Sequence, residues 1–217
     1  MPPILRPTTR HQGAAVIKGT PYWNDPYRYY TQVNNALEEV LRRYKAEESA
    51  VTCGPTTAIN CLASIGAEID TLTPAGWSPQ PEDVLTLWFH DQRNWPVLSE
   101  VRKETRPDDT KYSPHEVPQY YPTAVKEVFG VECVFRWIFD FQEIADIVSS
   151  GRAVQIAKKK PGHYIAVVAY DDFTEQLIIN DPYPQFYVNN NGFNQHLSKH
   201  EYSFNIQPYA IIYGEGK

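Results

Sequence analysis

One stretch decides how this chain folds: Thr52-Cys53-Gly54-Pro55-Thr56-Thr57-Ala58-Ile59-Asn60-Cys61-Leu62. Proline suits the first turn of a helix because its missing N–H is not needed there, so Pro55 marks a helix start. Between positions 58 and 65, apolar residues recur at intervals of three and four and form one helical face. Gly66 is a typical residue for the end of that helix.

Cys53 lies at the start of this predicted helix. Free backbone N–H groups and the positive end of the helix dipole both favour a thiolate there. Two interpretations are open: a nucleophilic thiol, or a buried and inert cysteine that caps the helix. The local sequence does not decide between them, because a nucleophile also needs a base and a group that orients the base.

The chain has 217 residues, enough for one good core and short for two domains. Its net charge of −6 argues against a nucleic-acid partner, because phosphate binding needs a basic surface. No apolar run is long enough to span a bilayer, and the first residues lack the apolar core of a signal peptide. We therefore expect a cytoplasmic protein without a nucleic-acid or membrane partner.

Three cysteines without CxxC spacing predict neither a disulfide framework nor a zinc site. Cys61 and Cys133 fall on expected apolar surfaces and are predicted to be core residues. His196 and His200 have the spacing of two metal ligands on a helix, but the glutamate of a zinc-peptidase motif and a third ligand are missing. A solvated polar face is the better interpretation, and we expect no metal or other cofactor.

The predicted elements run from helices to strands, the order of an α+β domain. Residues 1–25 are expected to form an irregular arm with one short strand at 14–17, and residues 26–217 a single domain. Residues 96–122, polar and broken by prolines, are predicted as an insertion that serves as a lid or binding loop. The other helices are expected at 36–45, 81–94, 122–129 and 140–147.

The predicted strands lie in the second half of the chain, with a hairpin turn at 171–175. They are expected at 131–137, 153–157, 163–170, 176–180, 186–188 and 210–213. Six tryptophans and tyrosines nearer the middle of the chain are expected to pack in the core, and all six are also candidate walls of a substrate groove. They are Trp77, Trp88, Trp95, Tyr112, Tyr120 and Tyr121.

His163 is a candidate base because Pro161-Gly162 precedes it and an apolar strand follows it. A polar ring at the start of an apolar strand lies at a rigid edge, which suits a base that must keep its position. Taken alone, it is better explained as a strand-end histidine that bonds to backbone. The preceding run Lys158-Lys159-Lys160 is predicted as a solvated hairpin turn that could also attract an anionic group.

Asp181 is a candidate for the group that orients this base. It ends the strand that follows the hairpin turn, and it lies as far beyond the turn as His163 lies before it. The antiparallel return therefore places Asp181 beside His163. The alternative is an ordinary Asp-Pro turn residue. Nothing in the periodicity brings Cys53 to this pair.

Four motifs in this order resemble the C39-like branch of the papain-like cysteine peptidases. They are Cys53-Gly54-Pro55-Thr56, the segment from Phe139 to Gln155, the segment from Gly162 to Asp172, and Asn180-Asp181-Pro182-Tyr183. The resemblance runs from about Gln32 to Tyr183. It implies a papain-like fold with N-terminal helices packed on a C-terminal antiparallel sheet. It also implies that Cys53 is the nucleophile, His163 the general base and acid, and Asp181 the orienting group.

The same family supplies a glutamine upstream of the cysteine that helps to bind the oxyanion. In many members this glutamine lies close to the cysteine, where the present chain has Glu47, a poor donor when ionised. Other relatives carry a Gln-x-Asp-Asn element further upstream, and Thr31-Gln32-Val33-Asn34-Asn35 is similar to it. The resemblance therefore implies Gln32 as the oxyanion donor. The alternative is a polar residue that caps the helix expected at 36–45.

The activity that the resemblance implies is hydrolysis of a peptide or amide bond through an acyl-enzyme, with no cofactor. The expected partner is a peptide or peptide-like substrate, such as a cell-wall cross-link or a Gly-rich leader. Two alternatives stay open. The same triad supports acyl or peptidyl transfer, and a degenerate peptidase fold could serve as a binding module. Glu47 favours the binding module, whereas the intact Cys53, His163 and Asp181 weigh against it.

Overall fold

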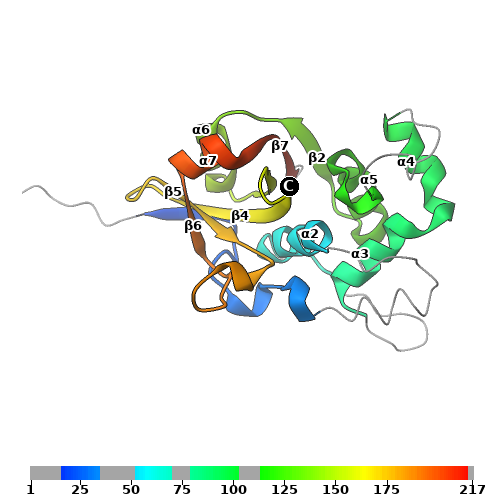
Figure 1. The fold of residues 1–217 in the computed structure, drawn as a ribbon, viewed down its shortest axis with the longest axis horizontal. Coiled ribbons are helices and arrows are strands. Elements are labelled where there is room, and N and C mark those ends of the chain that lie inside the picture. Colours follow the sequence, from blue (N-terminus) through cyan, green and yellow to red (C-terminus); the bar gives the residue numbers. More distant parts are fainter. Residues whose placement is uncertain (1–15, 35–51, 70–78, 103–112, 215–217) are drawn as a thin grey trace, which may run out of the picture.

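Helices and sheet meet along the helix that begins at Cys53 (Figure 1). The computed structural model describes residues 16–34, 52–69, 79–102 and 113–214. Its helices are α2 (Cys53–Ser64), α3 (Pro81–His90), α4 (Trp95–Arg102), α5 (Tyr121–Phe129), α6 (Phe141–Ser149) and α7 (Lys199–Asn205). Its strands are β1 (Ile17–Gly19), β2 (Cys133–Trp137), β3 (Ala153–Lys158), β4 (His163–Asp171), β5 (Gln176–Asn180), β6 (Gln195–Ser198) and β7 (Ile206–Tyr213).

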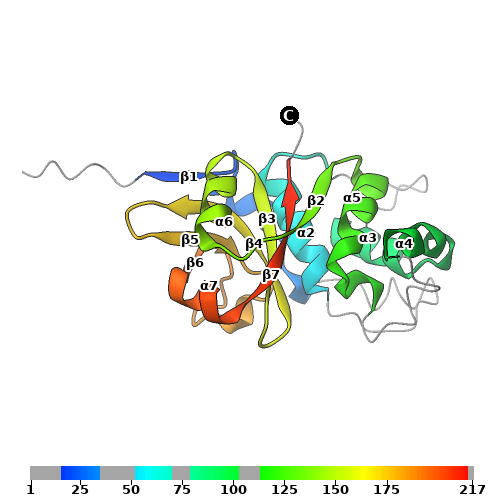
Figure 2. The same ribbon diagram turned by 90° about the horizontal axis from the view of Figure 1, so that it is seen from above.

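The strands form one antiparallel sheet. Within the described residues its order is β2-β7-β3-β4-β5-β6, and β1 pairs with the end of β4. α2 lies on one side of β4, and α6 and α7 lie on the other (Figure 1). α3, α4 and α5 gather beside α2, away from β5 and β6 (Figure 2). The predicted α+β architecture, with helices packed on a C-terminal sheet, is confirmed.

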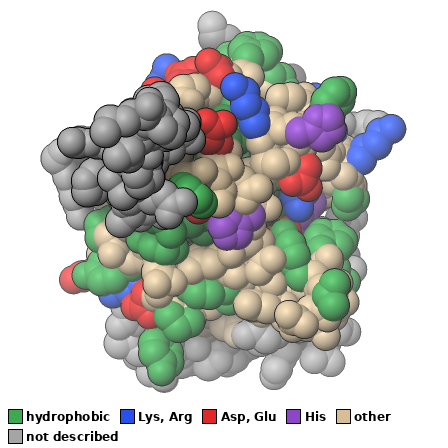
Figure 3. All heavy atoms as spheres, turned by 90° about the vertical axis from the view of Figure 1, so that its left-hand side faces the viewer, with side chains coloured by type: hydrophobic (Ala, Val, Ile, Leu, Met, Phe, Trp, Pro, Cys, Tyr) green, Lys and Arg blue, Asp and Glu red, His purple; other side chains and the backbone are tan. Residues whose placement is uncertain are grey.

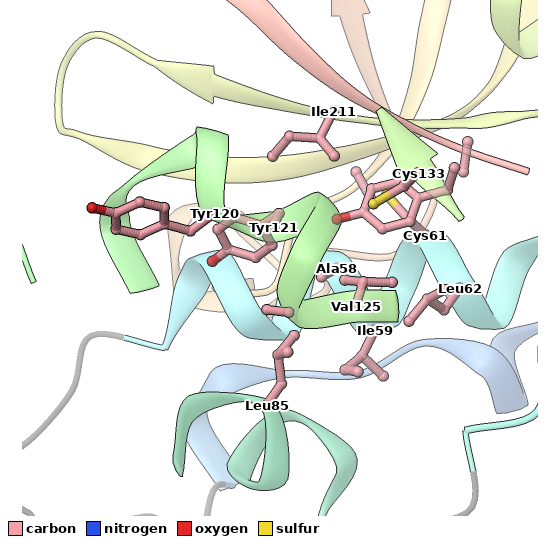
Figure 4. Close-up of a cluster of buried hydrophobic side chains, with 14 of the residues drawn as sticks. Ala58, Ile59, Cys61, Leu62, Leu85, Tyr120, Tyr121, Val125, Cys133 and Ile211 are labelled. Atoms are coloured by element: carbon pink, nitrogen blue, oxygen red, sulfur yellow. The ribbon is translucent and has the colours of Figure 1, made fainter. Parts of the chain in front are cut away.

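The sheet buries a separate hydrophobic cluster on each face, because successive side chains of a strand point to opposite sides. Ala166 and Val168 of β4 face the cluster around α2, whereas Ile165 and Val167 face the cluster around α6. The first of these clusters joins α2, α3, α5 and the sheet, as Figure 4 shows. α2 is buried along its whole length, so the helix that carries Cys53 is held from several sides.

The α2 prediction is confirmed. The helix begins at Cys53, with Pro55 in its first turn, and Gly66 follows its end with a φ of +78°. A positive φ suits glycine because no Cβ opposes it. Packing at Gly66 is also close, since an added Cβ would lie 2.6 Å from the ring of Tyr22.

The predicted helix 81–94 is too long at its C-terminal end. α3 ends at His90, a 3₁₀ turn (Gln92–Asn94) follows, and α4 begins at Trp95. Pro96 is the second residue of α4, where proline is tolerated because the first turn needs no N–H donor. Proline therefore opens a helix here instead of excluding one, and the predicted insertion at 96–122 starts with ordered structure.

The rest of that insertion is also partly structured. Short 3₁₀ turns at Pro114–Glu116 and Pro118–Tyr120 lead directly into α5. Tyr120 and Tyr121 are buried in the core, and Trp88 and Trp95 pack against it, so these aromatic residues support the fold. Residues 103–112, together with the predicted wall residues Trp77 and Tyr112, lie outside the described residues.

The predicted strand at 186–188 is wrong. A 3₁₀ turn (Pro184–Phe186) occupies this place, and the Tyr187 N–H donates to the Pro184 carbonyl at 3.0 Å. The strand that completes this edge is β6, which contains only one apolar residue, Leu197, and so gave no alternating pattern. His196 lies in β6 and His200 in α7, so the two do not share a helix face.

The N-terminal predictions can be compared with the structure only in part. The short strand is β1, three residues later than the predicted start, and it joins the sheet beside β4. The predicted helix 36–45 and the first fifteen residues lie outside the described residues. None of the described helices is long and apolar enough to cross a membrane. On the side that includes β5 and β6, acidic, basic and apolar side chains are interspersed (Figure 3).

Two acidic side chains are buried in the first turn of α3. Glu82 is 1% exposed and Asp83 is fully buried, and neither carboxylate oxygen of Asp83 has a hydrogen-bond partner in the described part of the chain. A helix N-terminus favours negative charge. Burial outweighs that effect, because it raises the pKa of Glu82 to about 7 and that of Asp83 to about 6.

These raised pKa values predict that the fold loses stability as pH rises. The folded chain keeps both protons at pH values where the unfolded chain has already released them. The contribution of these protons to the stability of the fold is therefore complete near pH 4, and it is lost as pH rises through about 6 to 7. We expect Glu82→Gln to raise the free energy of unfolding at pH 8 by about 2 kcal/mol, measured by urea denaturation. Glu127→Gln on the exposed face of α5 is the control. Equal effects of both variants at pH 8 would contradict the prediction.

Candidate active site

Cys53 lines a cavity of about 540 Å³ between the helices and the sheet. Cys53 is only 7% exposed, and its neighbours in a small buried cluster are Ala157 of β3 and Tyr164 of β4. His163, the first residue of β4, lines the same cavity. The structure thus brings the predicted nucleophile and the predicted base, 110 residues apart in sequence, to one cavity.

His163 and Asp181 are joined by a short hydrogen bond. The Nε2 atom of His163 lies 2.6 Å from Oδ1 of Asp181, at a point where the ring is 5% exposed and the carboxylate is fully buried. The β4–β5 hairpin pairs Asn180 with Ala166, so Asp181 follows directly after the paired part of β5, and its side chain reaches His163 at the start of β4. Because a carboxylate can only accept, Nε2 carries the proton in this bond. Nδ1 is then the ring nitrogen that remains for proton exchange in the cavity.

Asp181 receives further hydrogen bonds besides that of His163. The Tyr183 N–H donates to Oδ1 at 2.9 Å, and the Tyr187 hydroxyl donates to Oδ2 at 3.0 Å. The Lys158 ammonium lies 3.2 Å from Oδ2. Lys158 and His163 are direct cross-strand partners in the β3–β4 hairpin, so the carboxylate bridges an ammonium and an imidazole side by side.

This environment keeps Asp181 ionised. Burial alone would raise the pKa of Asp181, but the hydrogen bond and charge of His163, the charge of Lys158 and the Tyr183 N–H together hold this pKa below its ordinary value. The ring of Phe186 packs edge-on against His163 with 5.2 Å between centroids. The base is therefore held by a charged partner on one side and an aromatic ring on another.

Burial has the largest effect on the pKa of the Cys53 thiol. Burial raises the pKa of Cys53 to about 11, although backbone N–H groups of Tyr164 and Gly54 act in the opposite direction. The predicted thiolate at the helix N-terminus is thus outweighed by desolvation, and removal of the thiol proton depends on a base. Cys53 and His163, both described residues, share no hydrogen bond. Such bonds in unliganded sites often form only with substrate present.

The turn that carries Cys53 has no spare room. An added Cβ at Gly54 would lie 2.2 Å from the Tyr121 hydroxyl, so only glycine fits at this position. The Gly54 carbonyl accepts a hydrogen bond of 3.3 Å from the buried Gln155, whose side-chain oxygen accepts from Tyr213 at 2.5 Å. The position of the thiol is therefore fixed by the sheet beneath it.

The comparison with known families shows to which family this domain belongs. A family model described as the Peptidase_C39 like family matches residues 24–205. The chain belongs to this family. The match spans Cys53, His163 and Asp181, and it confirms the resemblance that the sequence motifs indicated. A search of curated proteins found no match.

Gln32, the predicted oxyanion donor of this C39-like domain, lies on the Asp181 side of the site. Its N–H donates to the carbonyl of Pro182 at 2.9 Å, and its side-chain oxygen is buried with no hydrogen-bond partner in the described part of the chain. Gln32 is not among the residues that line the cavity. Glu47, at the position where many relatives have the glutamine, lies outside the described residues. The role of Gln32 therefore stays a prediction.

Two groups of the C39-like site were missed in the sequence. Lys158 was predicted in a solvated turn, but its side chain is only 17% exposed because it reaches Asp181. Its place opposite His163 in the β3–β4 hairpin was a usable signal. Among the described residues, the tryptophans and tyrosines that line the cavity are Trp137, Tyr164 and Tyr209 of the sheet, and Trp88, Trp95, Tyr120 and Tyr121 do not line it. No three side chains of the described residues gather as ligands for a metal ion.

The Lys158–Asp181 contact predicts a pH-dependent loss of stability in Lys158→Met. Because the folded chain lowers the pKa of Asp181, the ionised carboxylate stabilises the fold above about pH 4, and this contribution is lost as pH falls further. Without the ammonium we expect the free energy of unfolding at pH 7 to fall by about 2 kcal/mol. The difference from wild type should shrink below pH 4, as followed by urea denaturation.

Lys159→Met is the matched control, since Lys159 is exposed in the same turn. It should change the free energy of unfolding by less than about 0.5 kcal/mol. A loss in Lys158→Met that is the same at pH 3 and pH 7 would show that packing, and not the charge on Asp181, explains it.

Proposed function

We propose that this chain is a cysteine peptidase that acts through Cys53, His163 and Asp181. The observation that carries the proposal is the buried hydrogen bond of 2.6 Å between His163 and Asp181 at the wall of the cavity that Cys53 also lines. A nucleophile, a base and a group that orients the base are the three parts that acyl transfer requires. Membership of the C39-like family gives independent support for this class of reaction.

The reaction begins with proton transfer from the Cys53 thiol to Nδ1 of His163. The sulfur attacks the carbonyl carbon of the scissile amide, and the carbonyl oxygen becomes an oxyanion. The Cys53 N–H at the start of α2, with Gln32 as the proposed second donor, stabilises this oxyanion. The imidazolium then gives its proton to the amide nitrogen as the C–N bond breaks, and a thioester and a free amine result.

Water completes the cycle. His163 takes a proton from water, which attacks the thioester carbonyl, and the carboxylic acid leaves as the Cys53 thiol is restored. Asp181 keeps the imidazole in one orientation and stabilises its charged form. Because burial raises the pKa of Cys53 to about 11, little free thiolate exists at neutral pH, and His163 is required for both halves of the reaction.

Alkylation with limiting iodoacetamide at pH 7 tests this role of His163. Because little free thiolate exists without a base, we expect His163→Ala to slow the reaction of Cys53 roughly a hundred-fold. Peptide mass spectrometry measures the modification of each cysteine, and the buried Cys61 and Cys133 are internal controls. If Cys53 reacts equally fast without His163, the activated nucleophile is excluded.

The oxyanion role of Gln32 has its own test. Loss of one oxyanion donor typically lowers the rate by roughly a hundred- to a thousand-fold, so Gln32→Ala should slow Cys53-dependent hydrolysis of p-nitrophenyl acetate by that factor. In the same variant, the rate at which iodoacetamide alkylates Cys53 should stay within about three-fold of wild type, because alkylation forms no oxyanion. Val33→Ala, at an exposed neighbouring position, is the control. Parallel losses in both assays would assign Gln32 a structural role.

A further inference from the structure

The sheet carries a group of aromatic rings at the cavity, here named the aromatic shelf: Phe135 and Trp137 of β2 and Tyr209 of β7. Trp137 and Tyr209 are direct cross-strand partners on neighbouring strands (Figure 2). Both line the cavity that Cys53 and His163 also line. Resting on the proposed function, we infer that the aromatic shelf binds a large apolar or aromatic side chain of the peptide substrate, close to the scissile bond.

The exposure of the shelf is the first argument. Trp137 is 60% exposed, whereas Phe135 and Tyr209 are half-buried beneath and beside it. A large apolar side chain left in water at a concave surface marks a binding site more often than an isolated surface residue does. Phe135 packs against the α2 cluster, so the shelf continues the hydrophobic core outward to the cavity.

The rigidity of the shelf is the second argument. Trp137 meets Phe135 and Tyr209 edge to face, with centroids 5.4 Å and 6.2 Å apart and planes near a right angle. The Tyr209 hydroxyl lies 3.3 Å from that of Tyr164, which in turn donates to the Glu116 carbonyl at 2.9 Å. A surface that is already ordered loses little conformational freedom when a ligand binds.

A single side chain, that of Tyr164, lies between Cys53 and the aromatic shelf. Tyr164 contacts Cys53 in their small buried cluster, and its hydroxyl meets the hydroxyl of Tyr209. A substrate whose carbonyl carbon lies at Cys53 therefore has room for only one or two residues before its side chain reaches the shelf. The shelf residue of the substrate is thus expected at the first or second position from the scissile bond.

The charges of the cavity decide between an apolar and a cationic occupant. An exposed tryptophan also attracts cations. Arg102 and Lys159 line the cavity, however, whereas the ammonium of Lys158 is paired with Asp181, and Glu116 is the one acid among the described lining residues. This excess of positive charge disfavours a lysine or arginine side chain on Trp137. Among the expected substrates, the shelf favours a peptide with a bulky residue over a Gly-rich leader.

Dipeptide chloromethyl ketones that alkylate Cys53 test the inference without a known substrate. A matched series carries Phe, Leu, Lys or Gly at the first or the second position from the reactive group. We expect Phe and Leu at one of these positions to react about 30-fold faster than Gly, and Lys to gain no advantage. Each rate is divided by the iodoacetamide rate of the same variant, so changes in the thiol itself cancel.

Trp137→Ala should reduce the preference for Phe over Gly to less than about three-fold, and Trp137→Leu should keep part of it. Phe139→Ala is the control, because Phe139 is 76% exposed nearby in sequence but does not line the cavity. Equal rates for Phe and Gly at both positions, fastest reaction with Lys, or a full preference in Trp137→Ala would each overturn the inference. The proposed function has a separate failure, namely iodoacetamide labelling of Cys53 that does not depend on His163.

Discussion

The buried negative charge of Asp181 is the interaction on which the rest of the site depends. A fully buried carboxylate is costly unless donors surround it, and here Lys158, His163, Tyr187 and the Tyr183 N–H supply them. These donors come from β3, β4 and the segment after β5. The backbone of Asp181 extends the network, since its carbonyl accepts from the Tyr29 hydroxyl at 2.6 Å and its N–H donates to Gly192 at 2.9 Å. The carboxylate therefore ties together three stretches of the chain, and the backbone of Asp181 adds contacts with Tyr29 and Gly192.

Lys158 gives the Asp181 carboxylate a counter-ion that does not depend on the protonation state of His163. If the imidazole were the only partner, each loss of its proton would leave the carboxylate charge buried without a counter-ion. The ammonium at 3.2 Å provides a counter-ion that stays in place whichever state the imidazole takes. Cys53 differs from Asp181, because burial raises the pKa of its thiol and so favours the protonated form. Together the two environments oppose a free thiolate and permit proton transfer at His163, which is the behaviour expected of a general base.

The sequence predicted those features that depend on local pattern or on hairpin geometry. The apolar period and Pro55 were enough for α2, and equal distances from one turn placed Asp181 beside His163. Features that depend on tertiary contacts were missed. Pro96 suggested the end of a helix and instead lies in the first turn of α4, and Lys158 looked like a solvated turn residue. The one signal for Lys158 was its place opposite His163 in the β3–β4 hairpin, and no local pattern shows that its side chain turns inward to a carboxylate more than twenty residues away.

The order of helices before strands explains why the site lies where it does. Cys53 begins a helix that is buried against one face of the sheet, and His163 begins the strand against which that helix packs. The two ends meet at the border between helices and sheet, so the cavity has one wall from each. On the sheet side that wall is made of Tyr164, Tyr209 and Trp137, whose rings are fixed by the same strand pairing that holds the base. The proposed chemistry and the proposed selectivity thus depend on one rigid element, and a change that shifted β7 relative to β3 would disturb both.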